Sequence, residues 1–115
     1  RDEGQEFFEL TTINNEIANL SGLSFIYIDG DASNAGLVDI VLDLDGLSTG
    51  SNGIFVWSDG NILWDPQANS SSTIQVGQFT NDDGNGTDME NGSATFAIVS
   101  DYSGSYKYYN DILWI

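Results

Sequence analysis

Two loops of the sequence carry side chains of the kind that bind a hard cation. One spans Asp29–Asn34 and the other Asn81–Glu90, and in both, oxygen-bearing side chains recur at alternate positions near glycines. Ca²⁺ takes about six to eight oxygen ligands, so this pattern predicts calcium as a cofactor. The expected ligands are acidic, amide and hydroxyl residues of the two loops: Asp29, Asp31, Asp82, Asp83, Asn85, Thr87, Asp88 and Glu90.

A second interpretation of both loops stays open. Neither loop fits the EF-hand pattern, which requires Gly at the sixth position and Glu at the twelfth. Gly, Asn, Asp and Ser also form solvated turns, because they tolerate positive φ or hydrogen-bond their own backbone. The two loops are therefore interpreted either as calcium sites or as hairpin turns.

The sequence is poor in catalytic residue types. It contains no Cys and no His, which excludes Ser-His-Asp and Cys-His centres, thiolate metal sites and imidazole ligands. Two carboxylate pairs, Asp43 with Asp45 and Glu6 with Glu9, are candidates for glycoside hydrolysis. Among 18 Asp and Glu residues, however, such pairs arise by chance. We therefore predict that the protein is not an enzyme.

The net charge restricts the partners. Only Arg1 and Lys107 oppose the acidic residues, so the formal charge is −16 and the pI is near 4.1. Binding to nucleic acid depends on Lys and Arg that displace counterions, which excludes nucleic acid and disfavours anionic membranes. Apolar runs such as Ile54–Trp57 are far shorter than the roughly 20 residues of a membrane span, so no membrane insertion is expected. This acidity suits a salty or calcium-containing medium and favours an extracellular or cell-surface location.

Short strands are predicted along most of the chain. In Leu37–Leu44, Val38, Ile40, Leu42 and Leu44 occupy alternate positions, which is a period of two with one apolar face. Other runs rich in aromatic and β-branched residues are Glu6–Leu10, Ser24–Asp29, Gly53–Trp57, Thr73–Phe79 and Ala94–Ser100, with weaker ones at Ile62–Trp64 and Tyr106–Tyr109. This pattern, divided by turn-forming clusters, predicts a sandwich or barrel.

The length of 115 residues predicts a single domain over the whole chain. Helical spacing of apolar residues within Ile13–Leu20 allows one short helix, and a loop is the equal alternative. The chain begins at Arg1 without Met and ends in the apolar run Ile112–Ile115. We therefore expect a processed product or a piece of a longer protein.

The order of several motifs resembles a known family. The motifs are EFFEL at Glu6–Leu10, LSGLSFIYIDGD at Leu20–Asp31, GLVDIVLDLDG at Gly36–Gly46, SNGIFV at Ser51–Val56 and ENGSATFAIV at Glu90–Val99. They are similar to those of the lamin-tail-like domains of secreted bacterial proteins. The resemblance implies an immunoglobulin-like antiparallel β-sandwich without an activity of its own, often attached to nucleases, phosphatases or surface proteins. The chain departs from the family pattern at Thr11–Asn19 and from Tyr106 onward.

The C-terminal region indicates how such a module would be used. Its aromatic and apolar residues form the expected interface: Tyr106, Tyr108, Tyr109, Ile112, Leu113, Trp114 and Ile115. Aromatic residues are enriched at protein contacts, and the run Asp111–Ile115 could add as a strand to the sheet of a neighbour. We expect a structural or adhesive module that assembles into a fibre or surface layer with itself or with other surface proteins.

Two other functions stay open. Trp57, Trp64 and Trp114 could form a stacking platform for glycans, which would make the chain a carbohydrate-binding module with structural calcium. The alternative for these tryptophans is packing within the core. The chain could also be an accessory domain of a secreted nuclease or phosphatase.

Overall fold

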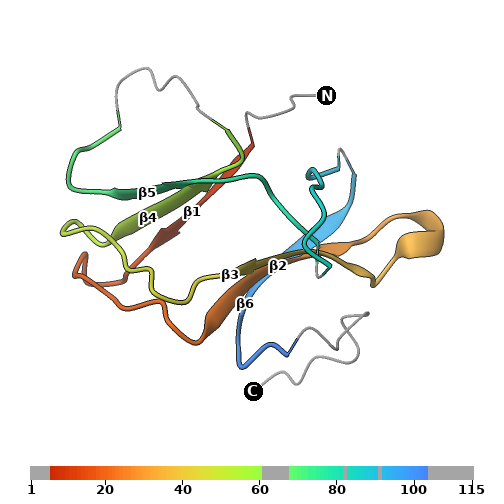
Figure 1. Cartoon of the computed structure of the whole chain (residues 1–115), viewed down its shortest axis with the longest axis horizontal. Coiled ribbons are helices and arrows are strands. Elements are labelled where there is room, and N and C mark those ends of the chain that lie inside the picture. Colours follow the sequence, from red (N-terminus) through yellow and green to blue (C-terminus); the bar gives the residue numbers. More distant parts are fainter. Residues whose placement is uncertain (1–5, 61–67, 82, 91, 104–115) are drawn as a thin grey trace. The chain divides into compact units, whose positions relative to one another are not determined.

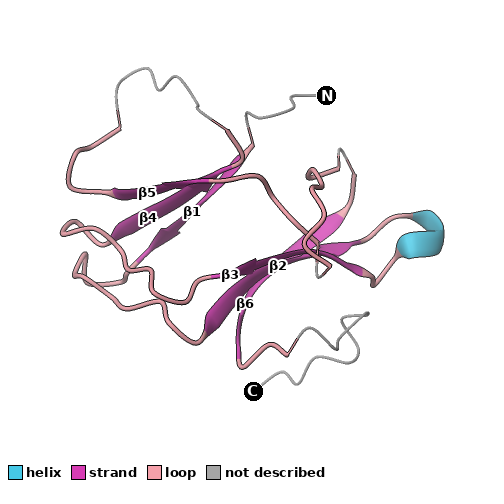
Figure 2. Cartoon of the chain, in the orientation of Figure 1, coloured by secondary structure: helices cyan, strands magenta, loops and turns pink. Residues whose placement is uncertain are grey.

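The computed structural model describes residues 6–60, 68–81, 83–90 and 92–103 (Figure 1). The fold is all-β, as predicted, and the described residues include one short 3₁₀ turn, η1 (Ala32–Asn34), coloured cyan in Figure 2. The strands are β1 (Phe7–Thr11), β2 (Leu23–Asp29), β3 (Val38–Asp43), β4 (Ile54–Ser58), β5 (Thr73–Val76) and β6 (Ala94–Ser100). Within the described residues, no helix has the length and apolar character needed to cross a membrane.

The six stronger strand predictions are confirmed, although the ends shift by up to three residues. β5 ends at Val76, and the next residue, Gly77, donates its N–H to the carbonyl of Ser58 at 3.0 Å. The helix considered for Ile13–Leu20 does not form. Ile13 is fully exposed and Ile17 is 66% exposed, so there is no buried apolar face to stabilise so short a helix. The weaker strands at Ile62–Trp64 and Tyr106–Tyr109 lie outside the described residues.

The strands form two three-stranded sheets, each within its own compact unit. The first unit combines Arg1–Ser21 with Gly46–Gln78 and holds the order β1-β4-β5. The second combines Gly22–Asp45 with Phe79–Ile115 and holds the order β3-β2-β6. The expectation of one domain over residues 1–115 stays a prediction.

The first sheet corrects the expectation of purely antiparallel pairing. β1 is antiparallel to β4, but β4 and β5 run parallel, with Phe55 opposite Thr73 and Ser58 opposite Val76. Parallel neighbours require a crossover of about a dozen residues or more. The connection between Ser58 and Thr73 meets this requirement, and turn-rich composition alone does not distinguish such a crossover from a hairpin.

Packing in the first unit centres on aromatic residues and a close backbone approach. Phe55 is fully buried, and its ring centroid lies 6.3 Å from that of Phe8. Gly50, in the turn before β4, has no room for a side chain, because a Cβ there would collide with the carbonyl oxygen of Ser71. This contact brings the segment before β5 close to β4.

β2 is the central strand of the second unit and is buried on both faces. Ile26 and Ile28 form an apolar cluster with Val38 of β3, and the less buried side chains packed against it are Val41, Ala97, Val99 and Tyr102. Tyr27 pairs with Ile40, but Ile28 pairs with Val38. Asp39 is therefore an extra residue, as in a β-bulge.

The predicted alternation of β3 is confirmed in its burial, since Val38, Ile40 and Leu42 are buried and the residues between them are less so. The bulge corrects only the expectation that Val38 lies on the same face as Ile40 and Leu42. The register shift groups Val38 with Ile26 and Ile28 instead. Strict alternation assumes that each residue has one partner, and the bulge breaks that assumption at Asp39.

Candidate functional site

The first predicted calcium loop follows β2 and is connected to the segment before β6. The carboxylate of Asp29, a buried residue, accepts the N–H of Asp31 at 2.8 Å. The Asp31 carboxylate in turn accepts the N–H of Ser93 at 2.9 Å, and Gly30 donates its N–H to the carbonyl of Ser93 at 2.7 Å. These bonds hold the two acidic side chains at one end of the second sheet.

The second predicted loop reaches the same end of the sheet through Tyr27. The phenol oxygen of Tyr27 lies 3.2 Å from the backbone nitrogen of Glu90 and 3.4 Å from its carbonyl oxygen. Burial raises the pKa of Tyr27, and the carboxylates of Glu90, Asp29 and Asp39 raise this pKa further, against a lowering by the backbone bond to Glu90. The tertiary structure thus places Asp29 and Glu90, which come from predicted loops distant in sequence, near one phenol.

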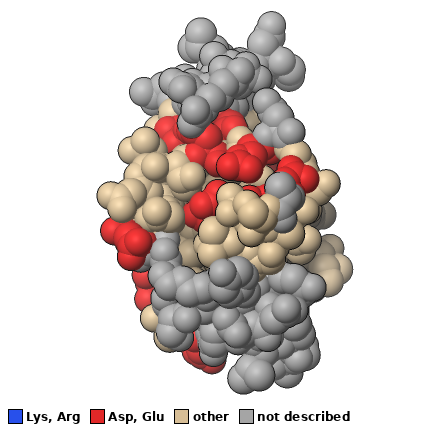
Figure 3. Space-filling model, turned by 90° about the vertical axis from the view of Figure 1, so that its right-hand side faces the viewer, with Lys and Arg blue, Asp and Glu red and all other residues tan. Residues whose placement is uncertain are grey.

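Asp39 is an acidic residue of this region that sequence reasoning did not select. Burial raises the pKa of its carboxyl group, and the nearby Asp29 raises it further. The alternating pattern of β3 indicated a solvated position for Asp39, and the bulge that brings it close to Asp29 has no signal in that pattern. Arg1 and Lys107 lie outside the described residues, so the part of the chain that the structure describes contains acidic groups without basic ones (Figure 3).

The remainder of the second loop contains a tight turn organised by Asn81. Its side-chain oxygen accepts the N–H groups of Asp83 and Asn85, both at 3.0 Å. Thr80 and Gly86 form an antiparallel bridge, and the Asp83 and Asn85 side chains are exposed. This geometry supports a hairpin turn over residues 80–86. Calcium ligation by Asp83, Asn85, Thr87 and Asp88 stays a prediction, and Asp82 lies outside the described residues.

In the Glu6–Glu9 pair, one of the two carboxylate pairs considered for catalysis, Glu6 lies close to Asp59. In the first unit, the backbone N–H of Asp59 donates to the carbonyl of Glu6 at 2.8 Å, and carboxylate oxygens of these two residues lie within 4.8 Å of each other. This pair could supply two ligands to a metal ion, and Asp59 was not among the predicted ligands. Glu9 is an exposed residue of β1.

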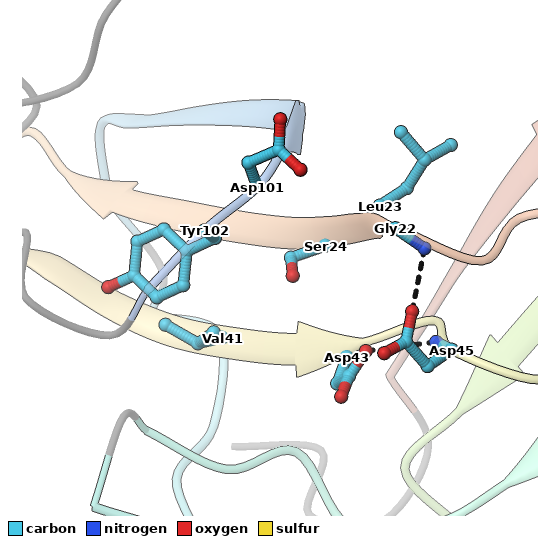
Figure 4. Close-up of a pocket in the computed structure, with 8 residues that line it drawn as sticks. All are labelled: Gly22, Leu23, Ser24, Val41, Asp43, Asp45, Asp101 and Tyr102. Carbon is cyan, nitrogen blue, oxygen red and sulfur yellow. Dashed lines mark hydrogen bonds between the residues drawn. The ribbon is translucent and has the colours of Figure 1, made fainter.

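Asp43 and Asp45 line a pocket of about 310 Å³ in the second unit (Figure 4). The other lining residues are Gly22, Leu23, Ser24, Val41, Asp101 and Tyr102. One carboxylate oxygen of Asp43 accepts the N–H of Asp45 at 2.9 Å, and one of Asp45 accepts the N–H of Gly22 at 2.6 Å. Each of these two residues therefore uses one oxygen to hold the turn after β3.

Of the three tryptophans considered as a stacking platform for glycans, the structure describes Trp57. Trp57 is half-buried and donates its ring N–H to the carbonyl of Gly77 at 2.8 Å, which links β4 to the segment after β5. Trp64 and Trp114 lie outside the described residues. The predicted interface also lies outside them, and it comprises Tyr106, Tyr108, Tyr109, Ile112, Leu113, Trp114 and Ile115.

β6 presents apolar side chains at an edge of the second sheet. It pairs with β2 on one side, and the described residues contribute no strand to its other side. Phe96 is 54% exposed and Ile98 is 40% exposed. This exposed edge was not predicted, because Ala94–Ser100 has the composition of any buried strand.

Searches of family models, curated proteins and solved structures find no match to this chain.

Proposed function

We propose that the chain is a non-catalytic, extracellular structural or adhesive module that associates with other copies of itself by strand addition at β6. The observation that carries this proposal is the edge of β6. Among the described residues, it is a regular and uncharged strand edge with large apolar side chains exposed.

The geometry of β6 suits it to accept another strand. Its seven residues pair one to one with β2, from Ala94 opposite Asp29 to Ser100 opposite Leu23. Because this ladder has no bulge, the outward-facing N–H and C=O groups form an even row. The strand contains neither Pro nor a charged residue, which are the features that usually prevent pairing at an edge.

Side chains at this edge would contribute apolar contacts. Phe96 packs against Tyr27 with ring centroids 5.4 Å apart and against Phe25 at 6.0 Å, so the ring is held in place although half of it is exposed. Strand addition combines backbone hydrogen bonds with contacts of alternate side chains. The apolar run Ile112–Ile115 of another copy is the donor that we propose.

Calcium would support such an assembly by lowering repulsion. Copies that each carry a formal charge of −16 repel one another, and bound cations or salt reduce this repulsion. The acidic residues near Tyr27 are the proposed place for calcium, and an immunoglobulin-like arrangement of the lamin-tail-like type is the proposed architecture. A fibre or surface layer outside the cell would provide the required concentration and calcium.

Sedimentation velocity over a range of protein concentrations, with millimolar calcium and then with a chelator, tests the proposal. We expect concentration-dependent growth that increases with calcium. Ile98→Lys should weaken the association by at least about tenfold, because pairing would bury an unpaired ammonium group. Phe7→Lys is the matched control, since Phe7 is a 48% exposed apolar residue on β1, in the other sheet.

Two results would contradict strand addition at β6. One is a chain that stays monomeric at the highest concentration with calcium present. The other is an equal loss of association with Ile98→Lys and with Phe7→Lys, because that would indicate general apolar attraction. Replacing Leu113 by Asp tests the donor separately and should reduce association to the same extent as Ile98→Lys.

A further inference from the structure

We propose that the pocket beside β2 and β3 binds a primary alkylammonium group, carried by a small amine or by a lysine side chain. This binding site does not depend on strand addition at β6. Its volume of about 310 Å³ is at the lower end of the range for ligand sites, so it suits a small group rather than a nucleotide.

The first observation is a hydroxyl group that opens onto the pocket. Ser24 is only 8% exposed and lines the pocket, yet its side chain makes no hydrogen bond within the described part of the chain. Figure 4 shows the hydroxyl in the space between Tyr102 and Asp43. The residue is largely buried, but its hydroxyl stays open to the pocket, so a ligand there can hydrogen-bond to it.

The second observation is the distribution of negative charge around the same space. Asp43, Asp45 and Asp101 contribute three exposed carboxylates to the pocket lining, and none of the described lining residues is basic. Asp43 and Asp45 each use one oxygen in a backbone hydrogen bond and keep the other for a ligand. An ammonium group donates three hydrogen bonds and accepts none, which complements this set of acceptors.

The spacing of the carboxylates favours an extended organic cation over a single metal ion. The carboxylates of Asp43, Asp45 and Asp101 are not among those in the described residues that converge within 4.8 Å of one another. One metal ion would need its ligands to converge more closely. An alkyl chain could instead pass along Val41, with Tyr102 offering an aromatic surface of the kind that attracts ammonium groups.

NMR titration of the full chain, in calcium-free low-salt buffer, provides the test. The probes are 1,5-diaminopentane, its neutral analogue 1,5-pentanediol, and the blocked peptide acetyl-Gly-Lys-Gly-amide. We expect the diamine or the peptide to shift the amide signals of Ser24, Val41 and Tyr102, whereas the diol has no effect. Shifts with both cations indicate a site open to small amines, and shifts with the peptide alone indicate a lysine of a partner protein.

Variants separate this site from general attraction to an acidic protein. Ser24→Ala should weaken binding by about fivefold, which corresponds to one hydrogen bond, without lowering the melting temperature, because the hydroxyl has no partner among the described residues. Asp101→Asn should weaken binding by about two- to fivefold. Glu16→Gln removes one exposed carboxylate of the other unit and should leave the affinity unchanged.

The proposal is overturned if neither cation shifts the pocket signals, or if the diol binds as well as the diamine. It is also overturned if Glu16→Gln weakens binding as much as Asp101→Asn does, because the attraction would then come from net charge alone.

Discussion

The two edges of the second sheet differ in every feature that controls strand pairing. β3 has the bulge at Asp39, two carboxylates in its sequence, and a backbone bond from the Val41 N–H to the carbonyl of Thr80 at 2.9 Å. β6 has an uninterrupted ladder, no charge and two large apolar side chains at the surface. Bulges, charges and covering segments are the usual means of blocking an edge. Among the described residues, the β3 edge therefore carries features that block pairing, and the β6 edge carries none of them.

This difference also separates residues that support the fold from residues that are free for association. Val38 is 5% exposed and belongs to the apolar cluster of the second unit. Ile98 has a side chain of similar character but is 40% exposed. We therefore expect buried apolar residues of β3, such as Val38, to contribute strongly to stability. Exposed apolar residues of β6, such as Ile98, should contribute less than fully buried side chains of the same size would.

Truncation of one residue on each edge should produce the largest difference. Val38→Ala is expected to lower the free energy of unfolding by about 2 kcal/mol, because it leaves a cavity in a buried cluster. Ile98→Ala should lower it by less than about 1 kcal/mol, because much of the side chain is already in water. Urea denaturation of both variants measures the difference. Equal losses would mean that β6 is as much a part of the core as β3.

Loss of the Tyr27 hydroxyl should have a smaller effect on stability, and this effect should be local to the segment that precedes β6. Tyr27→Phe removes the group that holds the backbone of Glu90, four residues before β6 begins. We expect a loss of about 1 kcal/mol in stability and faster hydrogen exchange at the Glu90 amide. The Val41 amide, bonded to Thr80 at the opposite edge, is the internal control and should keep its protection. Uniform loss of protection at both edges would contradict a local role for Tyr27.

Neutralising the bulge residue should have the smallest effect, and this effect should depend on pH. The pKa of Asp39 is raised by burial and by Asp29, so the folded state holds this proton more tightly than the unfolded state does. The stabilising contribution is thus complete at acidic pH and is lost as pH rises from the ordinary carboxyl range through the raised pKa. Asp39→Asn should match the wild type in acid and exceed it at neutral pH by up to about 1 kcal/mol.

Thermal unfolding of Asp39→Asn from pH 3 to pH 8, with chelator present, measures this dependence. Glu16→Gln, which changes an exposed carboxylate in the other unit, controls for the change in net charge. A gain in stability that is constant across this pH range would rule out the titration of Asp39 as its cause. Added calcium should narrow the gap between the wild type and Asp39→Asn if the cation binds near Asp29.

Local sequence patterns were sufficient to locate the strands but not to describe their pairing. Ala94–Ser100 was predicted with the bounds observed for β6, because β-branched and aromatic residues favour extended backbone wherever they cluster. The exposed side of that strand, however, depends on which strands are its neighbours. The same limit applies to β5, whose parallel pairing with β4 depends on a crossover rather than on the residues of Thr73–Val76.

For the candidate sites as well, some properties are visible in the sequence and others depend on contacts between distant residues. Strong acidity, the lack of His and Cys, and the short strands can be read from the sequence, because these properties follow from composition and from neighbouring residues. The folded chain is needed to see that Asp29 and Glu90 both lie near Tyr27, that Asp39 bulges out of β3, and that the hydroxyl of Ser24 faces a pocket. Register and burial arise from contacts between residues far apart in the chain, and no local pattern encodes these contacts.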